Sequence, residues 1–132
     1  MIKFITDMLK DKKKNPLPCI AGIEHVGELT IIKLSGDLDF DTLKCLSNNI
    51  NDEMKDVFDR NILLDFKRVK NADSSTLAYL ISLLSKLQKQ HRKLGIINTS
   101  EHLDSYITIG RVDQLIHRYN NEEDALKELK IT

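Results

Sequence analysis

Three aspartates alternate along one short stretch of the chain, at Asp37, Asp39 and Asp41. Carboxylates at alternate positions open a calcium-binding loop, in which the sixth residue is glycine and the twelfth a bidentate glutamate. A loop that starts at Asp37 has Thr42 and Asn48 at those two positions. The pattern therefore does not predict calcium binding, and we interpret Asp41 as the cap of the helix that follows.

The side chains that most often bind metals are scattered along the chain. The four histidines share no His-x-x-x-His spacing, and the two cysteines, Cys19 and Cys45, form neither a Cys-x-x-Cys clip nor a disulfide framework. Phosphate-binding loops and the Gly-x-Ser-x-Gly elbow of serine hydrolases are also missing from the sequence. We predict no metal, no cofactor, no catalytic residue and reduced, structural cysteines.

A run of short polar residues, Asp73-Ser74-Ser75, directly precedes the strongest amphipathic pattern in the sequence. That pattern predicts a helix from about Asp73 to His91, with an apolar face made by Leu77, Leu80, Ile81, Leu84 and Leu87. Aspartate or serine at a helix start accepts a hydrogen bond from the first-turn amides, so one interpretation is helix capping. The other is recognition, because the hydroxyls would emerge at a sheet edge. Local sequence leaves both open.

Strands and helices are predicted to alternate around these residues. Strand-like runs cover residues 20–25, 28–34, 61–66 and 94–98, and helical patterns cover residues 41–58, 73–91, 102–109 and 121–129. A short apolar stretch, Leu115-Ile116, precedes the last helix, in which Ala125 and Leu129 face inward. The predicted class is therefore α/β: a mixed sheet of about four to five strands, with parallel pairs and helices packed against it.

The composition limits the size and the partners of this domain. At 132 residues the chain is long enough for one domain, with residues 18–132 as its extent. Lysine plus arginine and aspartate plus glutamate both total 20, so no net charge attracts nucleic acid. No run approaches the roughly 20 apolar residues of a membrane span. We expect a cytoplasmic protein that does not bind nucleic acid.

Residues 1–17 are predicted to be an extension outside the domain. They are rich in lysine and aspartate and end in Asn15-Pro16-Leu17-Pro18, which disfavours continued helix. Ile2, Ile5, Met8 and Leu9 nevertheless recur at helical spacing. The segment is either a frayed tail or a helix that docks on the domain, on a partner or on a membrane surface.

Taken in order, the motifs resemble the STAS domain family, which includes bacterial anti-sigma factor antagonists and the cytosolic ends of sulfate transporters. The matching stretches run from about residue 19 to 129 and are Ile32-Lys33-Leu34-Ser35-Gly36-Asp37-Leu38-Asp39, Ile62-Leu63-Leu64-Asp65-Phe66, Ala72-Asp73-Ser74-Ser75-Thr76-Leu77, Tyr106-Ile107-Thr108-Ile109-Gly110 and Asn121-Glu122-Glu123-Asp124-Ala125-Leu126.

The resemblance implies a regulatory role in bacterial signal transduction and transcription. In the antagonists, the serine after the motif's aspartate is phosphorylated by a serine kinase of the anti-sigma factor type and dephosphorylated by a serine phosphatase. That residue corresponds to Ser74, chosen over Ser75 by the alignment alone. The unphosphorylated antagonist binds the anti-sigma factor, and the partner interface carries over to Asp39, Asp73, Ser75, Thr76 and Tyr79.

One position departs from the family pattern. Thr76 stands where the family usually has glycine, and a β-branched residue removes the close backbone approach that glycine permits. This departure and the basic extension keep a second function open: a constitutive STAS interaction subunit of a lipid-transport ATPase or another membrane-associated complex. Peripheral membrane contact through residues 1–17 belongs to that alternative.

Overall fold

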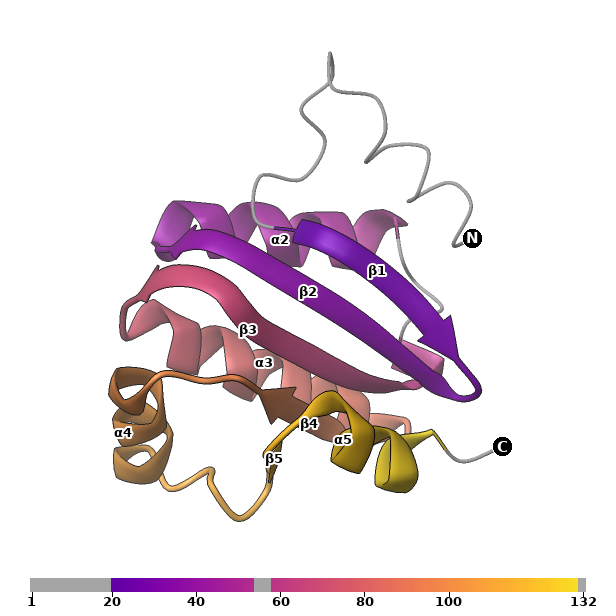
Figure 1. Cartoon of the computed structure of the whole chain (residues 1–132). Coiled ribbons are helices and arrows are strands. Elements are labelled where there is room, and N and C mark those ends of the chain that lie inside the picture. The colour runs from indigo at the N-terminus through magenta and orange to yellow at the C-terminus, as the bar shows by residue number, and fades with distance from the viewer. Residues whose placement is uncertain (1–19, 54–57, 131–132) are drawn as a thin grey trace.

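The computed structural model describes residues 20–53 and 58–130. Its centre is one mixed five-stranded sheet whose spatial order follows the chain, with the first pair antiparallel and the other pairs parallel (Figure 1). The strands are β1 (Ile20–Val26), β2 (Leu29–Leu38), β3 (Asn61–Ala72), β4 (Leu94–Ile97) and β5 (His117–Tyr119). The predicted α/β class and the mixed sheet are confirmed.

A tight hairpin joins β1 to β2. Val26 pairs with Leu29 across the turn, and Gly27 adopts a positive φ of 58° that glycine reaches without steric cost. The strands that follow are connected through helices, as parallel neighbours require.

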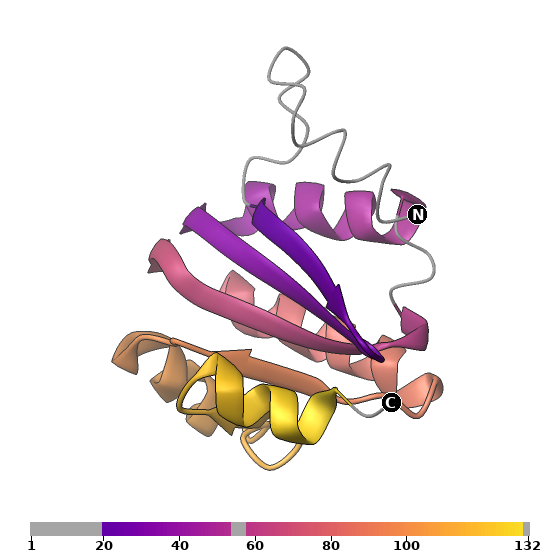
Figure 2. The same ribbon diagram turned by 45° about the vertical axis from the view of Figure 1, so that its right-hand side comes forward.

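Within the described residues, four helices cover the two faces of the sheet unequally. They are α2 (Phe40–Glu53), α3 (Ser75–Lys89), α4 (Glu101–Ile109) and α5 (Glu122–Leu129). The larger cluster of buried side chains joins α2, α3 and α4 to one face, and the smaller cluster joins α5 to the other (Figure 2). Ile32 and Leu34 enter the first cluster while Leu29 and Ile31 enter the second, because successive strand residues point to opposite faces.

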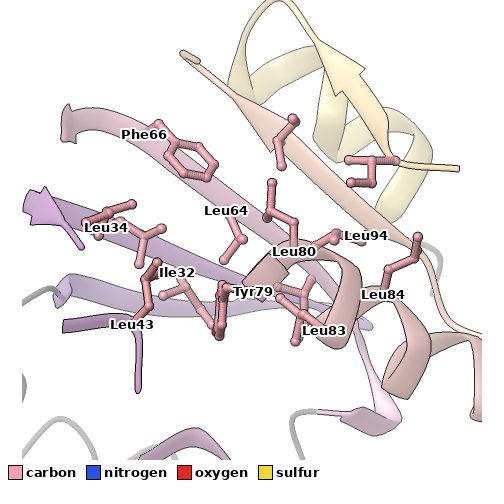
Figure 3. Close-up of a cluster of buried hydrophobic side chains, with 14 of the residues drawn as sticks. Ile32, Leu34, Leu43, Leu64, Phe66, Tyr79, Leu80, Leu83, Leu84 and Leu94 are labelled. Atoms are coloured by element: carbon pink, nitrogen blue, oxygen red, sulfur yellow. The ribbon is translucent and has the colours of Figure 1, made fainter. Parts of the chain in front are cut away.

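The buried face of α3 differs in part from the predicted one. Leu80, Leu84 and Leu87 are buried as predicted, and Leu77 is half-buried, but Ile81 is 43% exposed. In its place α3 buries residues on its other flank, including Tyr79 and Leu83, which point toward the sheet and α2 (Figure 3). The difference arises because α3 packs against α2 as well as against the sheet, which moves the buried stripe toward α2.

Several predicted boundaries also moved. β3 continues six residues past Phe66, to Ala72, and β5 was not predicted at all. The helix predicted over residues 41–58 begins at Phe40, and Phe58 lies in a separate short 3₁₀ turn. Ile116 is buried, whereas Leu115 is 50% exposed. The extension predicted at residues 1–17, and Cys19, lie outside the described residues.

Candidate functional site

Ser74 lies at the junction where β3 ends and α3 begins. Its backbone is already helical, with φ −63° and ψ −18°, and its side chain makes no capping hydrogen bond. The residue is exposed to solvent. The capping role belongs to Asp73, whose Oδ1 accepts a hydrogen bond of 2.9 Å from the Ser75 amide. Capping therefore falls to Asp73, and the Ser74 side chain is exposed and takes no part in it.

The parallel pairing of β2 with β3 brings a second set of polar residues to the same edge. Leu38 pairs with Ala72 at the ends of the two strands, and the Asp73 amide donates to the Leu38 carbonyl at 3.3 Å. Asp39 and Asp73, which are distant in the sequence, therefore leave neighbouring strands side by side. Both carboxylates are exposed.

Asp39, and not the predicted Asp41, caps α2. The Oδ1 atom of Asp39 accepts from the Thr42 amide at 2.9 Å, and this hydrogen bond lowers the pKa of the Asp39 carboxyl. The prediction for Asp41 was wrong because α2 starts at Phe40, which places Asp41 inside the first turn. There an exposed carboxylate is still favoured by the helix dipole.

This edge of the sheet carries a concentration of negative charge. Asp37, Asp39, Asp41 and Asp73 are all exposed, and none of the four forms an ion pair with the part of the chain that the structure describes. Asp37 accepts a hydrogen bond of 2.9 Å from the Asn71 amide nitrogen, which is uncharged. A partner that approaches Ser74 therefore meets an acidic surface.

An apolar groove lies between α2 and α3 beside Ser75. It has a volume of about 290 Å³ and is lined by Phe40, Leu43, Lys44, Ser47, Asn48, Ser75, Ala78, Tyr79 and Ser82. Phe40 is 65% exposed at its mouth. Sequence reasoning missed Phe40, although one signal was available: an aromatic residue directly before a helix whose apolar stripe begins only at Leu43.

The residues predicted for the partner interface divide into three groups. Asp39 and Asp73 lie on the surface, and Ser75 and Tyr79 line the groove, Tyr79 with 9% of its surface exposed. Thr76 is fully buried, so its side chain is not presented at the surface. The helical period explains this division, because residues 75 and 79 face α2 while residue 76 turns toward the sheet.

Two further structural findings concern metals and membranes. Within residues 20–53 and 58–130, no three histidine, cysteine, aspartate or glutamate side chains are grouped so that they could hold a metal ion. No helix in the same ranges combines the length and the apolar character needed to cross a membrane.

Comparisons with known proteins identify relatives of this chain and structures with the same fold. A curated relative, the anti-sigma F factor antagonist of Paenibacillus polymyxa, is 21% identical over 109 residues, which cover 83% of this chain and 93% of the relative. The structure of an anti-sigma factor antagonist from Mycobacterium paratuberculosis superposes with a TM-score of 0.70 at 21% identity, covering 83% of this chain and 92% of that one.

A third protein of the same fold is known in a modified state. It is the Bacillus cell fate determinant SpoIIAA in its phosphorylated form, with a TM-score of 0.60, 21% identity, and coverage of 80% of this chain and 96% of that chain. The model of the STAS domain matches residues 21–125, which is most of the chain and includes β2, α2, β3 and α3, the elements that form the Ser74 edge. The chain therefore belongs to the STAS domain family.

Proposed function

We propose that this protein is a cytoplasmic, non-catalytic regulator of the anti-sigma factor antagonist type, which docks on a partner protein at the Ser74 edge. A partner serine kinase of the anti-sigma factor type would phosphorylate Ser74 and a serine phosphatase would reverse the reaction. The observation that carries the proposal is the exposed Ser74 hydroxyl at the first turn of α3, which is not used for capping because Asp73 supplies the cap.

Phosphorylation at this position is expected to leave the domain folded. A phosphate adds about −1.5 to −2 charges, which a helix N-terminus favours by roughly 0.3 to 1 kcal/mol. The Asp73 carboxylate opposes this, because like charges about 6 Å apart repel by a little under 1 kcal/mol per charge product in water. The two effects nearly cancel, so the modification changes the surface and not the fold.

An interface built over the neutral hydroxyl responds more strongly. Burying an unmatched phosphate in it would cost on the order of 2 to 5 kcal/mol, or roughly 30-fold to several-thousand-fold in affinity. Asp37, Asp39 and Asp41, which form no ion pair with residues 20–53 and 58–130, increase this penalty, because they already make the edge negative. The switch is therefore local electrostatics at a preformed docking edge.

The test compares phosphorylation and binding across three serines of α3 and its start. The wild type is incubated with a serine kinase of the anti-sigma factor type, and intact mass is measured alongside Ser74→Ala and Ser75→Ala. Only Ser74→Ala should abolish phosphate incorporation. Partner affinity should fall at least 30-fold in Ser74→Asp and be retained in Ser74→Ala.

Ser85→Asp is the matched control, since it places the same charge on an exposed position further along α3. It should leave partner affinity unchanged. Equal affinities for Ser74→Ala and Ser74→Asp, with no phosphate incorporated by the wild type, would refute the switch. That result would favour the constitutive interaction subunit of a membrane-associated complex instead.

A further inference from the structure

The second half of β3 continues past the end of β4. The pairing of the two strands ends where Asp65 lies opposite Ile97, whereas β3 runs on beside β2 to Ala72 and bends near the start of α4 (Figure 1). A polar cavity of about 150 Å³ lies between this edge of β3 and α4. The polar residues of its lining are Lys67, Lys70 and Asn71 from β3, and Asn98, Thr99 and Ser100 from the connection between β4 and α4.

Two β-bulges interrupt the pairing of β3 with β2 along the cavity. At the first, Phe66 and Lys67 lie opposite the single residue Leu34. The amide of Lys67 donates to Asp65 Oδ1 at 2.9 Å, which holds this bulge in place. At the second, Lys70 is an extra residue without a register partner on β2. Each bulge therefore contains one of the two lysines that line the cavity.

The bulges change which side chains share a face of β3. In a regular strand alternate residues face the same side, so Lys70 would point into the core with Phe66. Instead Phe66, Val69 and Ala72 all pack in or against the larger buried cluster, at spacings of three. Lys67 and Lys70 follow the same spacing, and both are exposed. Bulges next to functional sites re-aim side chains, and here two of them bring two lysines to one cavity.

The two lysines give the cavity a positive charge. They are the only charged side chains among the described residues of its lining, and neither forms an ion pair with residues 20–53 and 58–130. Ser100 Oγ accepts from the Leu103 amide at 3.1 Å, and a hydroxyl that accepts a hydrogen bond can also donate its own hydrogen. Two cations and a hydroxyl donor are groups that bind an anion.

Three aspartates near the cavity leave this charge in place, although they accept hydrogen bonds from its polar lining. Asp37 and Asp65 each directly precede a residue of the larger buried cluster, so their carboxylates project from the opposite face of the sheet. Asp104 already pairs with Arg118, with 3.3 Å between Oδ1 and Nη1. The charge inside the cavity is therefore set by the two lysines.

We propose that this cavity binds one phosphate group, whose negative charge is matched by Lys67 and Lys70. A cavity of about 150 Å³ accepts one benzene molecule, so it has room for a phosphate group, which is no larger. An extended peptide fits this edge poorly, because bulges and lysines prevent a strand edge from pairing with another strand. The phosphate group belongs either to the free ion or to a phosphorylated side chain of another protein, and the two sources share this chemistry.

Titration of the isotope-labelled, full-length protein with inorganic phosphate, followed by NMR at constant ionic strength, tests the site. The amide signals of Lys67, Lys70, Thr99 and Ser100 should shift along one saturating binding curve. Lys67→Gln and Lys70→Gln should each weaken binding about ten-fold or more, and the double variant should show no saturation. Lys67→Arg combined with Lys70→Arg keeps both charges and should retain binding.

Lys89→Gln combined with Lys93→Gln is the matched control. It removes the same charge from two exposed lysines at the other end of the sheet, where α3 ends and β4 begins. This control should bind phosphate like the wild type. Ser74→Ala should do so as well, because Ser74 is not part of the lining, so the result does not depend on the function of that serine. Thermal melts in chloride confirm that all variants are folded.

Three results would overturn the proposal. The first is the absence of saturation in the wild type, or equal binding by the wild type and the double glutamine variant of Lys67 and Lys70. The second is an equal loss of binding in the control variant of Lys89 and Lys93, which would assign the effect to net charge. The third is an equal response to acetate, which would show that the site does not select phosphate.

A short peptide that contains phosphoserine then identifies the source of the phosphate group. Binding of this peptide tighter than that of inorganic phosphate, and lost in the double glutamine variant, assigns the cavity to a phosphorylated protein. Weaker binding of the peptide than of inorganic phosphate assigns the cavity to the free ion.

Discussion

Thr76 provides the sharpest test of how the start of α3 is built, because its hydroxyl is buried without a partner. The residue has no exposed surface, and its Oγ1 atom forms no hydrogen bond within the described part of the chain. A buried hydroxyl without a hydrogen bond costs about 1 to 3 kcal/mol on protein mutational scales. We therefore predict that Thr76→Val, which has nearly the same shape, stabilises the protein.

The magnitude follows from three contributions. Removing the unpaired hydroxyl contributes about 1 kcal/mol or more, and the methyl group that replaces it adds favourable apolar burial of up to about 0.8 kcal/mol. Valine and threonine have similar helix propensities, so the backbone term is close to zero. The free energy of unfolding should rise by about 1 to 2 kcal/mol, which corresponds to several degrees in Tm for a domain of this size.

Urea denaturation followed by circular dichroism measures the effect, with two companion variants. Thr76→Ser keeps the hydroxyl and loses the methyl, and should destabilise by about 1 kcal/mol. Thr76→Gly introduces the usual residue of the family and should destabilise further, by about 2 kcal/mol, because glycine leaves space and is a poor helix former. A destabilised Thr76→Val together with a neutral Thr76→Ser would refute the reasoning, since it would mean that the hydroxyl is hydrogen-bonded.

Three other predictions concern the packing of the sheet and its pH dependence. Asn61→Ala should lower the free energy of unfolding, measured by urea denaturation, by about 2 to 4 kcal/mol. The buried Asn61 side chain donates to the Leu129 carbonyl at 2.9 Å and accepts from the Lys93 amide at 2.8 Å, and the substitution leaves both backbone groups without this partner. A change under 1 kcal/mol would contradict this. Gly95→Ala should cost about 1 to 3 kcal/mol, because a Cβ atom would lie 2.6 Å from Leu129 Cδ1; a neutral variant would show that α5 yields easily. Burial of His25 lowers the pKa of its imidazole in the folded state, so the contribution of this histidine to stability is present above about pH 6.5 and is lost as the pH falls. His25→Gln should therefore flatten the rise of the unfolding free energy between about pH 5 and 7. An unchanged slope would exclude His25 as the source of that rise.

Periodicity was sufficient for the elements that bury one continuous face. The strand run at Ile62-Leu63-Leu64 and the helix of Leu80, Leu84 and Leu87 were both found, because burial on a strand or helix imposes a repeat that residue types reveal. The repeat could not predict where β3 ends. Its second half, Lys67–Ala72, is largely polar and exposed, and it is held as a strand because β2 continues beside it as far as Leu38.

The shortest strand had no pattern to detect. β5 has only three residues, His117–Tyr119, none of them aliphatic, and it is ordered by pairing with β4. The choice of Asp39 over Asp41 as the cap of α2 depended likewise on the backbone, because a cap is defined by the residue at which helical geometry begins. Nothing in the residue types distinguishes the two aspartates.

The sequence by itself determined the fold class, the order of the main elements and the position of Ser74 at the start of a helix, because these depend on local chemistry and on the repeat of apolar residues. Only the tertiary structure decided which residues meet at the site. The parallel register of β2 and β3 places Asp39 beside Asp73, and the packing of α2 on α3 opens the groove at Phe40 and buries Thr76. Such proximities arise between segments that are far apart in the chain, so no local pattern records them.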